Sequence, residues 1–429
     1  MENILYPPKD TWSALCKRPL LDIPNLEKPV RMILNRVKVE GDKAIRDYSK
    51  QFDKVDLDDI KVSPIEVEEA AGLVPSALKK AIETAKRNIE KFHMSQVHEP
   101  AIIETMPGVR CWRKDVPVEK VGLYIPGGTA PLFSTVLMLS IPAKIAGCRR
   151  VVICTPPDQT GKINPLVLYA ASLTGITEIF KAGGAQAIAA MAYGTETIPR
   201  VNKIFGPGNQ YVTRAKEIVQ SEGVAIDMPA GPSEVLVIAD SSADPSFVAA
   251  DLLSQAEHGP DSQVVLLTDS SELMAEVKNE VDSQLQKLPR KSIAGYSLLN
   301  SLAILLNDMN ECIEFSNKYA PEHLIINTKD ASELATKVIN AGSVFIGRYS
   351  CESAGDYASG PNHTLPTNGY ARTFSGVSVD SFVKKITFQE LSAEGIGKVG
   401  PAVELMAEAE GLAGHRNAVS IRLKNIGND

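Results

Sequence analysis

Residues 235–268, VLVIADSSADPSFVAADLLSQAEHGPDSQVVLLT, place two short apolar runs on either side of a segment with helical character. The runs at 235–240 and 263–268 are rich in Val, Leu and Ile, which is typical of buried β-strands. The segment between them should end as a helix, because Gly259 and Pro260 follow its last apolar residues. A strand-to-strand length of about thirty residues is that of a βαβ unit, which predicts parallel strands joined by a right-handed crossover.

A second unit of nearly the same length lies earlier in the chain. The run VGLYIP at 121–126 leads through a loop and an apolar segment near 134–146 to RVVICT at 150–155. Further strand–loop–helix steps begin with EIFKAGG at 178–184 and KIFGPGN at 203–209. We predict an α/β protein with two Rossmann-like lobes, each a doubly wound parallel sheet. The similar unit lengths suggest that the lobes arose by duplication and that one is inserted in the other.

Changes in composition along the chain predict the domain boundaries. The first hundred residues are charged and helical in pattern, as in PSALKKAIETAKRNIEKFHM at 75–94, and the chain becomes helical and glycine-punctuated again after about residue 376. The predicted parts are an N-terminal helical segment at 1–24, a discontinuous first lobe at 25–127 with 234–375, an inserted second lobe at 128–233, and a small helical C-terminal tail domain at 376–429.

Composition also narrows the class of partner. The 429 residues carry a net charge of −7 with no basic block, which argues against nucleic acid or an anionic membrane as partner. Six cysteines without a C-x-x-C spacing indicate reduced thiols and a cytoplasmic location. The N-terminus lacks a secretory signal, and prolines and glycines interrupt the uncharged run at 121–143, so we expect neither secretion nor a membrane span.

Three glycine-containing loops follow predicted strands and precede predicted helices. They are YIPGGTA at 124–130, AGGAQA at 182–187 and GPGNQY at 206–211. The last has the first two glycines of G-x-G-x-x-G, but Tyr211 stands at the third position. Free N–H groups at such helix starts can face an anion, so together the loops favour an elongated phosphate-bearing ligand. Each loop alone also fits an ordinary glycine or proline turn.

The histidines point to a metal site. Four of the six, His258, His323, His363 and His415, lie in compact polar motifs beside the acidic residues Glu322, Asp356 and Glu410. Any one of them fits equally a capping or core histidine; His258, for example, would complement a helix dipole. Gln255 and His258 are three apart, so both face one side of the helix end. Two histidines with Asp356 and Gln255 suit zinc or a harder divalent ion and leave room for substrate.

Two further motifs contain side chains that could act in catalysis. Glu322 and His323 are neighbours in YAPEHL, and if the segment is extended their side chains should face apart, as two bases for two different protons. The alternative is a strand entrance with a surface glutamate and a packed histidine. Cys351, in YSCESAGDYASG at 349–360, is the only cysteine in a loop of this kind and the candidate for a thiol nucleophile.

The chain closely resembles the L-histidinol dehydrogenase family over nearly its whole length. The resemblance is carried by these blocks, in order: GPGNQYV, DMPAGPSEVLVIAD, LLSQAEHGPDSQ, YAPEHL, AGSVFIG, GDYASGPNHTLPT, ARTFSGVSVDSF and EGLAGHRNAVSIR. It implies a four-electron oxidation of L-histidinol to L-histidine through L-histidinaldehyde, with two NAD⁺ and one Zn²⁺ per subunit. This is the last step of histidine biosynthesis.

The resemblance also implies roles for individual residues. The metal ligands of the family match Gln255, His258, Asp356 and His415, and its catalytic pair matches Glu322 and His323. Its substrate contacts match Ser233, Gln255, His258, His323, Asp356, His363, Glu410 and His415. Its NAD⁺ contacts match Tyr124, Gln186 and Asn209. The family is a cytoplasmic homodimer whose tail reaches the partner's site, so Glu410 and His415 are expected to act in trans.

Three other functions use some of the same residues. A zinc hydrolase would use Glu322 to activate water and would ignore NAD⁺. A thiol-based aldehyde dehydrogenase would depend on Cys351 and tolerate metal removal. A non-catalytic binding protein of two α/β lobes would explain the architecture but leave the histidines and carboxylates without a role.

Overall fold

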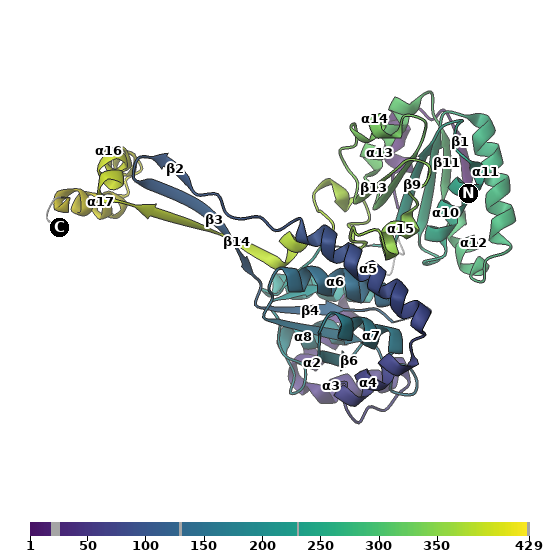
Figure 1. Ribbon diagram of the computed structural model, residues 1–429, viewed down its shortest axis with the longest axis horizontal. Coiled ribbons are helices and arrows are strands. Elements are labelled where there is room, and N and C mark those ends of the chain that lie inside the picture. Colours follow the sequence, from purple (N-terminus) through teal and green to yellow (C-terminus); the bar gives the residue numbers. More distant parts are fainter. Residues whose placement is uncertain (19–25, 128–130, 230, 427–429) are drawn as a thin grey trace.

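The computed structural model describes residues 1–18, 26–127, 131–229 and 231–426. It consists of two α/β lobes and a long antiparallel arm that carries the C-terminal helices away from both lobes (Figure 1). Three predicted features fall partly outside the described residues: the end of the loop at 124–130, and the boundaries near residues 24 and 128. The prediction of an α/β protein with two parallel sheets is confirmed.

The opening stretch lies at the centre of the first sheet. Six strands are seen within the described ranges in the order β1-β11-β10-β9-β12-β13, and every neighbouring pair is parallel. They are β1 (Glu2–Leu5), β9 (Glu234–Ala239), β10 (Gln263–Thr268), β11 (Leu302–Leu305), β12 (His323–Asn327) and β13 (Ser343–Ile346). All residues of β9 and β10 are buried. Val235 and Val237 pack into one core while Leu236 and Ile238 pack into another, so β9 is covered on both faces.

Helices and short turns flank this sheet. They are η1 (Lys9–Thr11), α1 (Trp12–Leu15), α10 (Pro245–Ala256), α11 (Ser271–Leu285), α12 (Lys291–Leu299), α13 (Met309–Tyr319), α14 (Ala331–Ala335) and α15 (Glu352–Tyr357). Helix α10 starts where the Asp244 carboxylate accepts a 3.0 Å hydrogen bond from the Ser246 N–H, with Pro245 at the first helical position. It ends two residues before His258, so the predicted strand–helix–strand unit is confirmed.

The second sheet is formed, in the described part of the chain, by five parallel strands in the order β6-β5-β4-β7-β8. They are β4 (Lys120–Tyr124), β5 (Arg150–Thr155), β6 (Glu178–Lys181), β7 (Lys203–Phe205) and β8 (Ala225–Ile226). One face packs against α4 (Pro64–Leu73), α5 (Ser76–Met94), α6 (Phe133–Ile145) and α7 (Pro165–Leu173). The other packs against α2 (Glu27–Glu40), α3 (Asp42–Tyr48), α8 (Gly184–Tyr193) and α9 (Gln210–Ser221).

The N-terminal elements are placed differently from the predicted division. The prediction places residues 25–127 in one lobe with residues 234–375. In the structure, the helices between residues 27 and 94 instead pack on the five-stranded sheet, and β4 lies between β5 and β7 in that sheet. Conversely, β1, from the predicted 1–24 segment, is an edge strand of the six-stranded sheet. An amphipathic helix pattern shows that one face is buried but not which sheet covers it, so sequence periodicity could not place these helices.

The arm is an antiparallel sheet of β2 (Ile103–Met106), β3 (Val109–Pro117) and β14 (Val383–Leu391). The 3-10 turns η3 (Tyr370–Arg372) and η4 (Val379–Phe382) precede β14, and α16 (Ala393–Ala409) and α17 (Ala413–Asn425) follow it at the far end of the arm (Figure 1). The tail predicted at 376–429 is therefore helical only after a long strand. Helix α17 buries none of its residues within one chain.

The uncharged run at 121–143 is an interior element. It comprises β4, a loop and α6, whose residues 134–143 are buried against the sheet. No helix of the described residues has both the length and the apolar character needed to cross a membrane. All six cysteines lie in described positions and are free thiols.

Candidate active site

The predicted catalytic residues lie at the amino end of the six-stranded sheet. His323 is the first residue of β12 and pairs with Val235 at the start of β9, while Gln255 is in the last turn of α10. This end of the sheet is opposite to the carboxyl ends of the strands, where ligands of open α/β sheets usually bind. The residues lie at the amino end because α10 and α13 both run back to that end of the sheet before β10 and β12 begin.

Strand alternation predicts that the side chains of Glu322 and His323 face apart, but in the structure they lie close together. The Glu322 Oε2 atom lies 3.6 Å from the His323 Nδ1 atom, which is close but beyond hydrogen-bond length. Glu322 precedes the first residue of β12, so the alternation of an extended strand does not reach it. Both groups are buried, with exposed fractions of 6% and 3%.

Glu234, at the start of β9, orients both members of this pair. Its N–H donates a 2.9 Å hydrogen bond to Glu322 Oε2, and its carbonyl oxygen lies 3.2 Å from His323 Nδ1. A carbonyl can only accept, so Nδ1 carries a hydrogen, and Nε2 is the nitrogen that gains or loses a proton when His323 changes between its charged and neutral forms. The Glu234 carboxylate is itself buried in a 2.8 Å ion pair with Arg18. Sequence reasoning singled out neither Glu234 nor Arg18.

Acidic groups surround the His323 ring. Its Nδ1 lies 3.6 Å from Glu352 Oε1, and its Nε2 lies 3.5 Å from Asp356 Oδ1. Burial lowers the pKa of His323, but the carboxylates of Glu352 and Glu322 outweigh burial and raise that pKa well above its ordinary value. Burial raises the pKa of Glu352 well above the usual range, although the positive charge of His323 opposes the shift. The site therefore holds several carboxylates around one imidazole.

Four buried polar atoms of this cluster have no hydrogen-bond partner among the described residues: Gln255 Oε1, His323 Nε2, Glu352 Oε2 and Asp356 Oδ1. Ligand atoms of His323, Glu352 and Asp356 all lie within 4.8 Å of one another. Uncompensated burial of such groups is costly, and a cation would satisfy the oxygens. Two of the four atoms belong to predicted metal ligands, so the donor set fits a divalent ion.

The other two predicted metal ligands lie in different parts of the chain: His258 follows α10, and His415 is in α17. His258 is exposed just beyond α10. Burial raises the pKa of Asp356, but the interaction with His323 outweighs burial and lowers that pKa, and the nearby charges of His363 and His258 lower it further. Helix α10 packs against α15, which brings Gln255 and His258 toward Asp356. His415 and the substrate-contact candidate Glu410 are exposed on the tail, at the far end of the arm from α10 and α15 (Figure 1). One chain alone does not bring them into the cluster.

Glu352 is the acidic residue of this cluster that sequence reasoning missed. It is 1% exposed and stands one residue after Cys351 in a motif that was singled out for other residues. A signal was available, because Glu352 and Asp356 are four apart and therefore share a helix face. Cys351, in contrast, is exposed at the start of α15.

The remaining predicted substrate contacts lie nearby. The His363 Nδ1 atom is 2.9 Å from the carbonyl oxygen of Asp356, and its Nε2 atom is 3.2 Å from Thr135 Oγ1 on α6. His363 therefore links α15 to a helix of the other lobe. Burial lowers the pKa of His363, which favours a neutral ring there. Ser233 directly precedes β9, and its carbonyl oxygen accepts a 3.1 Å hydrogen bond from the Gln263 N–H.

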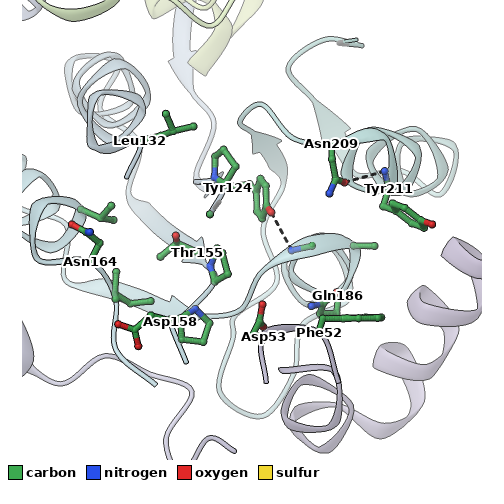
Figure 2. Close-up of a pocket in the computed structure, with 18 of the residues that line it drawn as sticks. Phe52, Asp53, Tyr124, Leu132, Thr155, Asp158, Asn164, Gln186, Asn209 and Tyr211 are labelled. Carbon is green, nitrogen blue, oxygen red and sulfur yellow. Dashed lines mark hydrogen bonds between the residues drawn. The ribbon is translucent and has the colours of Figure 1, made fainter. Parts of the chain in front are cut away.

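The glycine loops open on a large cavity at the carboxyl end of the five-stranded sheet. Its volume is about 910 Å³, and it is lined by the three predicted cofactor contacts, Tyr124, Gln186 and Asn209 (Figure 2). The Gly184 N–H, at the start of α8, donates a 3.0 Å hydrogen bond to the Tyr124 hydroxyl. The Asn209 side-chain oxygen caps α9 by accepting from the N–H groups of Tyr211 and Val212. A cavity of this size suits a nucleotide.

The loop before Asn209 is held by a buried ion pair. Lys216 and Asp227 form that pair; the Lys216 ammonium donates a 3.0 Å hydrogen bond to the Gly206 carbonyl, and the Gly206 N–H donates one of 2.8 Å to Asp227. Gly206 has a φ of +126°, and a Cβ atom there would lie 2.0 Å from the Tyr124 carbonyl oxygen. The position therefore requires glycine twice over, for its backbone conformation and for its closeness to β4.

Replacing Gly206 by alanine should destabilise the protein and weaken the cofactor loop. We expect a cost of about 3 kcal/mol or more, because steric displacement adds to a backbone strain of about 1–3 kcal/mol. Thermal unfolding of Gly206→Ala should be compared with that of Gly223→Ala, whose φ is +96° but which has nothing within 4 Å of the added atom. Equal losses in the two variants would mean that the approach to Tyr124 is unimportant.

Comparison with known proteins shows which family the chain belongs to. A family model described as histidinol dehydrogenase matches residues 16–423. The chain is 61% identical to the histidinol dehydrogenase of Bacteroides thetaiotaomicron over 99% of this chain and 100% of that one. It is 53% identical to that of Escherichia coli K12 over 94% and 92%. The crystal structure of histidinol dehydrogenase from Elizabethkingia anophelis superimposes with a TM-score of 0.98 at 57% identity, covering 99% of this chain and 98% of that one. The chain therefore belongs to the histidinol dehydrogenase family.

Proposed function

We propose that this chain oxidises L-histidinol to L-histidine through L-histidinaldehyde, using two NAD⁺ and zinc, as the last step of histidine biosynthesis. The observation that carries the proposal is the buried cluster around His323, in which metal-type oxygens without partners surround one oriented imidazole. A nucleotide-sized cavity in the other lobe and membership of the family support it further.

Gln255, His258 and Asp356 would hold one zinc ion per subunit, with His415 of a second copy as the fourth ligand. When bound, the ion supplies a fixed positive charge that can orient the imidazole and amino nitrogens of the substrate. The unpartnered oxygens of Gln255 and Asp356 support this ligand set. We assign Ser233, His363 and, from the second copy, Glu410 to the walls of the substrate site, together with the ligands and His323.

The tail supports a homodimer in which this exchange occurs. Helix α17 buries no residue within its own chain, and large apolar side chains of the tail are exposed, namely Leu405, Met406, Leu412 and Ile421. Several exposed apolar groups in one part of a chain, here the two tail helices and their connection, are typical of a surface that another subunit covers. A second copy of the chain would bury them and bring Glu410 and His415 to a site that lacks both.

His323 would act as the base for both oxidations. Its Nδ1–H faces the Glu234 carbonyl. With a bound cation balancing the surrounding carboxylates, the ring would be neutral and Nε2 would take the hydroxyl proton as a hydride leaves the same carbon. Tyr124, Gln186 and Asn209 would hold NAD⁺, which when bound supplies the acceptor for the hydride of each oxidation. Glu322 would remove a proton from water so that the aldehyde becomes a gem-diol, on which His323 then acts again. The hydrogen bond from the Glu234 N–H holds Glu322 Oε2, which fixes the direction of the carboxylate.

The test is the amount of NADH formed per L-histidinol consumed, run to completion with excess NAD⁺. We expect about two NADH per substrate, loss of the reaction with a zinc chelator, and recovery when zinc is restored. The Cys351→Ser variant should give the same stoichiometry, since Cys351 is exposed rather than part of the cluster. One NADH per substrate would mean that aldehyde is released, and none would favour a hydrolase or a binding protein.

A further inference from the structure

The nucleotide-sized cavity contains a carboxylate that the proposed reaction does not use. Asp53 ends η2 (Ser49–Asp53), and it lines the cavity together with the neighbouring Phe52 (Figure 2). Its buried Oδ2 atom has no hydrogen-bond partner in the described part of the chain. Burial raises the pKa of Asp53 to about 6, and the Ser49 hydroxyl offsets this only in part. Tyr124 lines the same cavity, so the two groups border one space (Figure 2).

A second carboxylate in the same cavity, Asp158, uses one of its oxygens within its own loop. Asp158 Oδ1 accepts hydrogen bonds from the Thr160 N–H at 2.8 Å, the Thr160 hydroxyl at 2.6 Å and the Lys162 N–H at 3.1 Å. These bonds close a turn of the chain, and the hydrogen bonds with Thr160 and Lys162 outweigh burial and lower the pKa of Asp158. Of the two acids, Asp53 is thus the one that a ligand would satisfy.

The charges of the cavity exclude one kind of ligand. Its lining residues include these two acids and, among the described residues, neither lysine nor arginine. A phosphate group placed at Asp53 would meet a partly desolvated negative charge with no cation to balance it. N–H groups in the first turns of α8 and α9 that are not used by Tyr124 or Asn209 can take a pyrophosphate. The side of the cavity formed by Phe52 and Asp53 would then contact uncharged parts of a ligand. The Phe52 residue is 48% exposed.

We propose that Asp53 selects the cofactor by accepting a hydrogen bond from a ribose hydroxyl of NAD⁺ and by repelling the 2′-phosphate of NADP⁺. The inference rests on the proposed function, because it assumes a dinucleotide in this cavity. A hydroxyl satisfies the unpartnered Oδ2, whereas a phosphate cannot donate to it. Acidic residues that bind the ribose select NAD⁺ in other dinucleotide sites, although here Asp53 comes from a helix outside the sheet.

The test compares kcat/KM for NAD⁺ and NADP⁺ in the unmodified enzyme, in Asp53→Asn and in Asp158→Asn. We expect the unmodified enzyme to favour NAD⁺ by at least about 100-fold, as like-charge repulsion predicts. Asp53→Asn should reduce this ratio by about 10-fold or more, because asparagine keeps the shape but loses the charge. The ratio in Asp158→Asn should stay within about 2-fold of the original, and the KM for L-histidinol should be unchanged in both variants.

Three results would overturn the assignment: equal use of NAD⁺ and NADP⁺ by the unmodified enzyme, an unchanged ratio in Asp53→Asn, or the same change in Asp158→Asn. Thermal unfolding checks that Asp53→Asn is folded, and its midpoint should not fall, because the substitution removes a buried charge. If L-histidinol is oxidised with neither cofactor, the proposed function fails instead. Calorimetric titration with NADH and NADPH then makes the same comparison, and equal affinities in the unmodified protein would overturn the role of Asp53.

Discussion

Replacing His323 by asparagine should lower kcat by about 10³-fold for both L-histidinol and L-histidinaldehyde. The imidazole Nε2 is the proposed base for both oxidations, and asparagine offers no base in its place. Asparagine can still donate a hydrogen bond toward the Glu234 carbonyl, so the start of β12 should keep its structure. The measurement is steady-state NADH formation from each substrate, with thermal unfolding as the check on folding.

Glu322→Gln is the matched variant, because it changes the adjacent residue and keeps an acceptor for the Glu234 N–H. It should reduce oxidation of the aldehyde by about 10²-fold or more while reducing oxidation of the alcohol much less, since only the aldehyde step needs an activated water. Equal losses on the two substrates would contradict this division of labour. A small effect of His323→Asn on either substrate would remove His323 from its role as base.

Replacing Asp356 by asparagine should abolish zinc binding and activity together. Asp356 supplies the only negative charge among the proposed ligands, and its Oδ1 is buried without a partner. Changes even in groups that only support ligands cost about 10–100-fold in metal affinity, so loss of a ligand should cost more than about 100-fold. Zinc content after gel filtration and competition with a chelator measure the affinity independently of turnover.

Asp251→Asn is the control for this experiment. Asp251 is another buried acid of α10, and burial raises its pKa to about 7, but it is not a proposed ligand. The variant should keep its zinc. Full zinc occupancy in Asp356→Asn, or equal loss in both variants, would show that Asp356 does not hold the metal.

Local sequence patterns predicted the parts of the fold that depend on nearby residues. The apolar runs at 235–240 and 263–268, with a helix stop at Gly259 and Pro260, correspond to β9, α10 and β10. The three glycine loops do precede helices, and the residues expected to contact NAD⁺ line one cavity. These predictions succeed because apolar strand runs, helix caps and turns are set within a few residues.

Long-range packing decided which sheet the helices cover, which strands pair and which side chains meet. The helices between residues 27 and 94 cover the five-stranded sheet rather than the expected one, and β14 pairs with β3 from a segment more than 250 positions earlier. Glu352 was missed although Asp356 was found, because its importance depends on the His323 ring 3.6 Å away. Spacing along the chain carries no information about such contacts.

The sequence by itself determined the α/β class, the two parallel sheets and, through its resemblance, the family, and it supplied the candidate residues for the proposed metal and cofactor sites. Only the tertiary structure decided that Glu322 and His323 share the two backbone groups of Glu234, that the predicted metal oxygens are buried without partners, and that the tail stands away from its own site. The physical reason is that residue type and local period set what a segment can form. The burial and partners of each polar atom depend on groups brought together from distant parts of the chain.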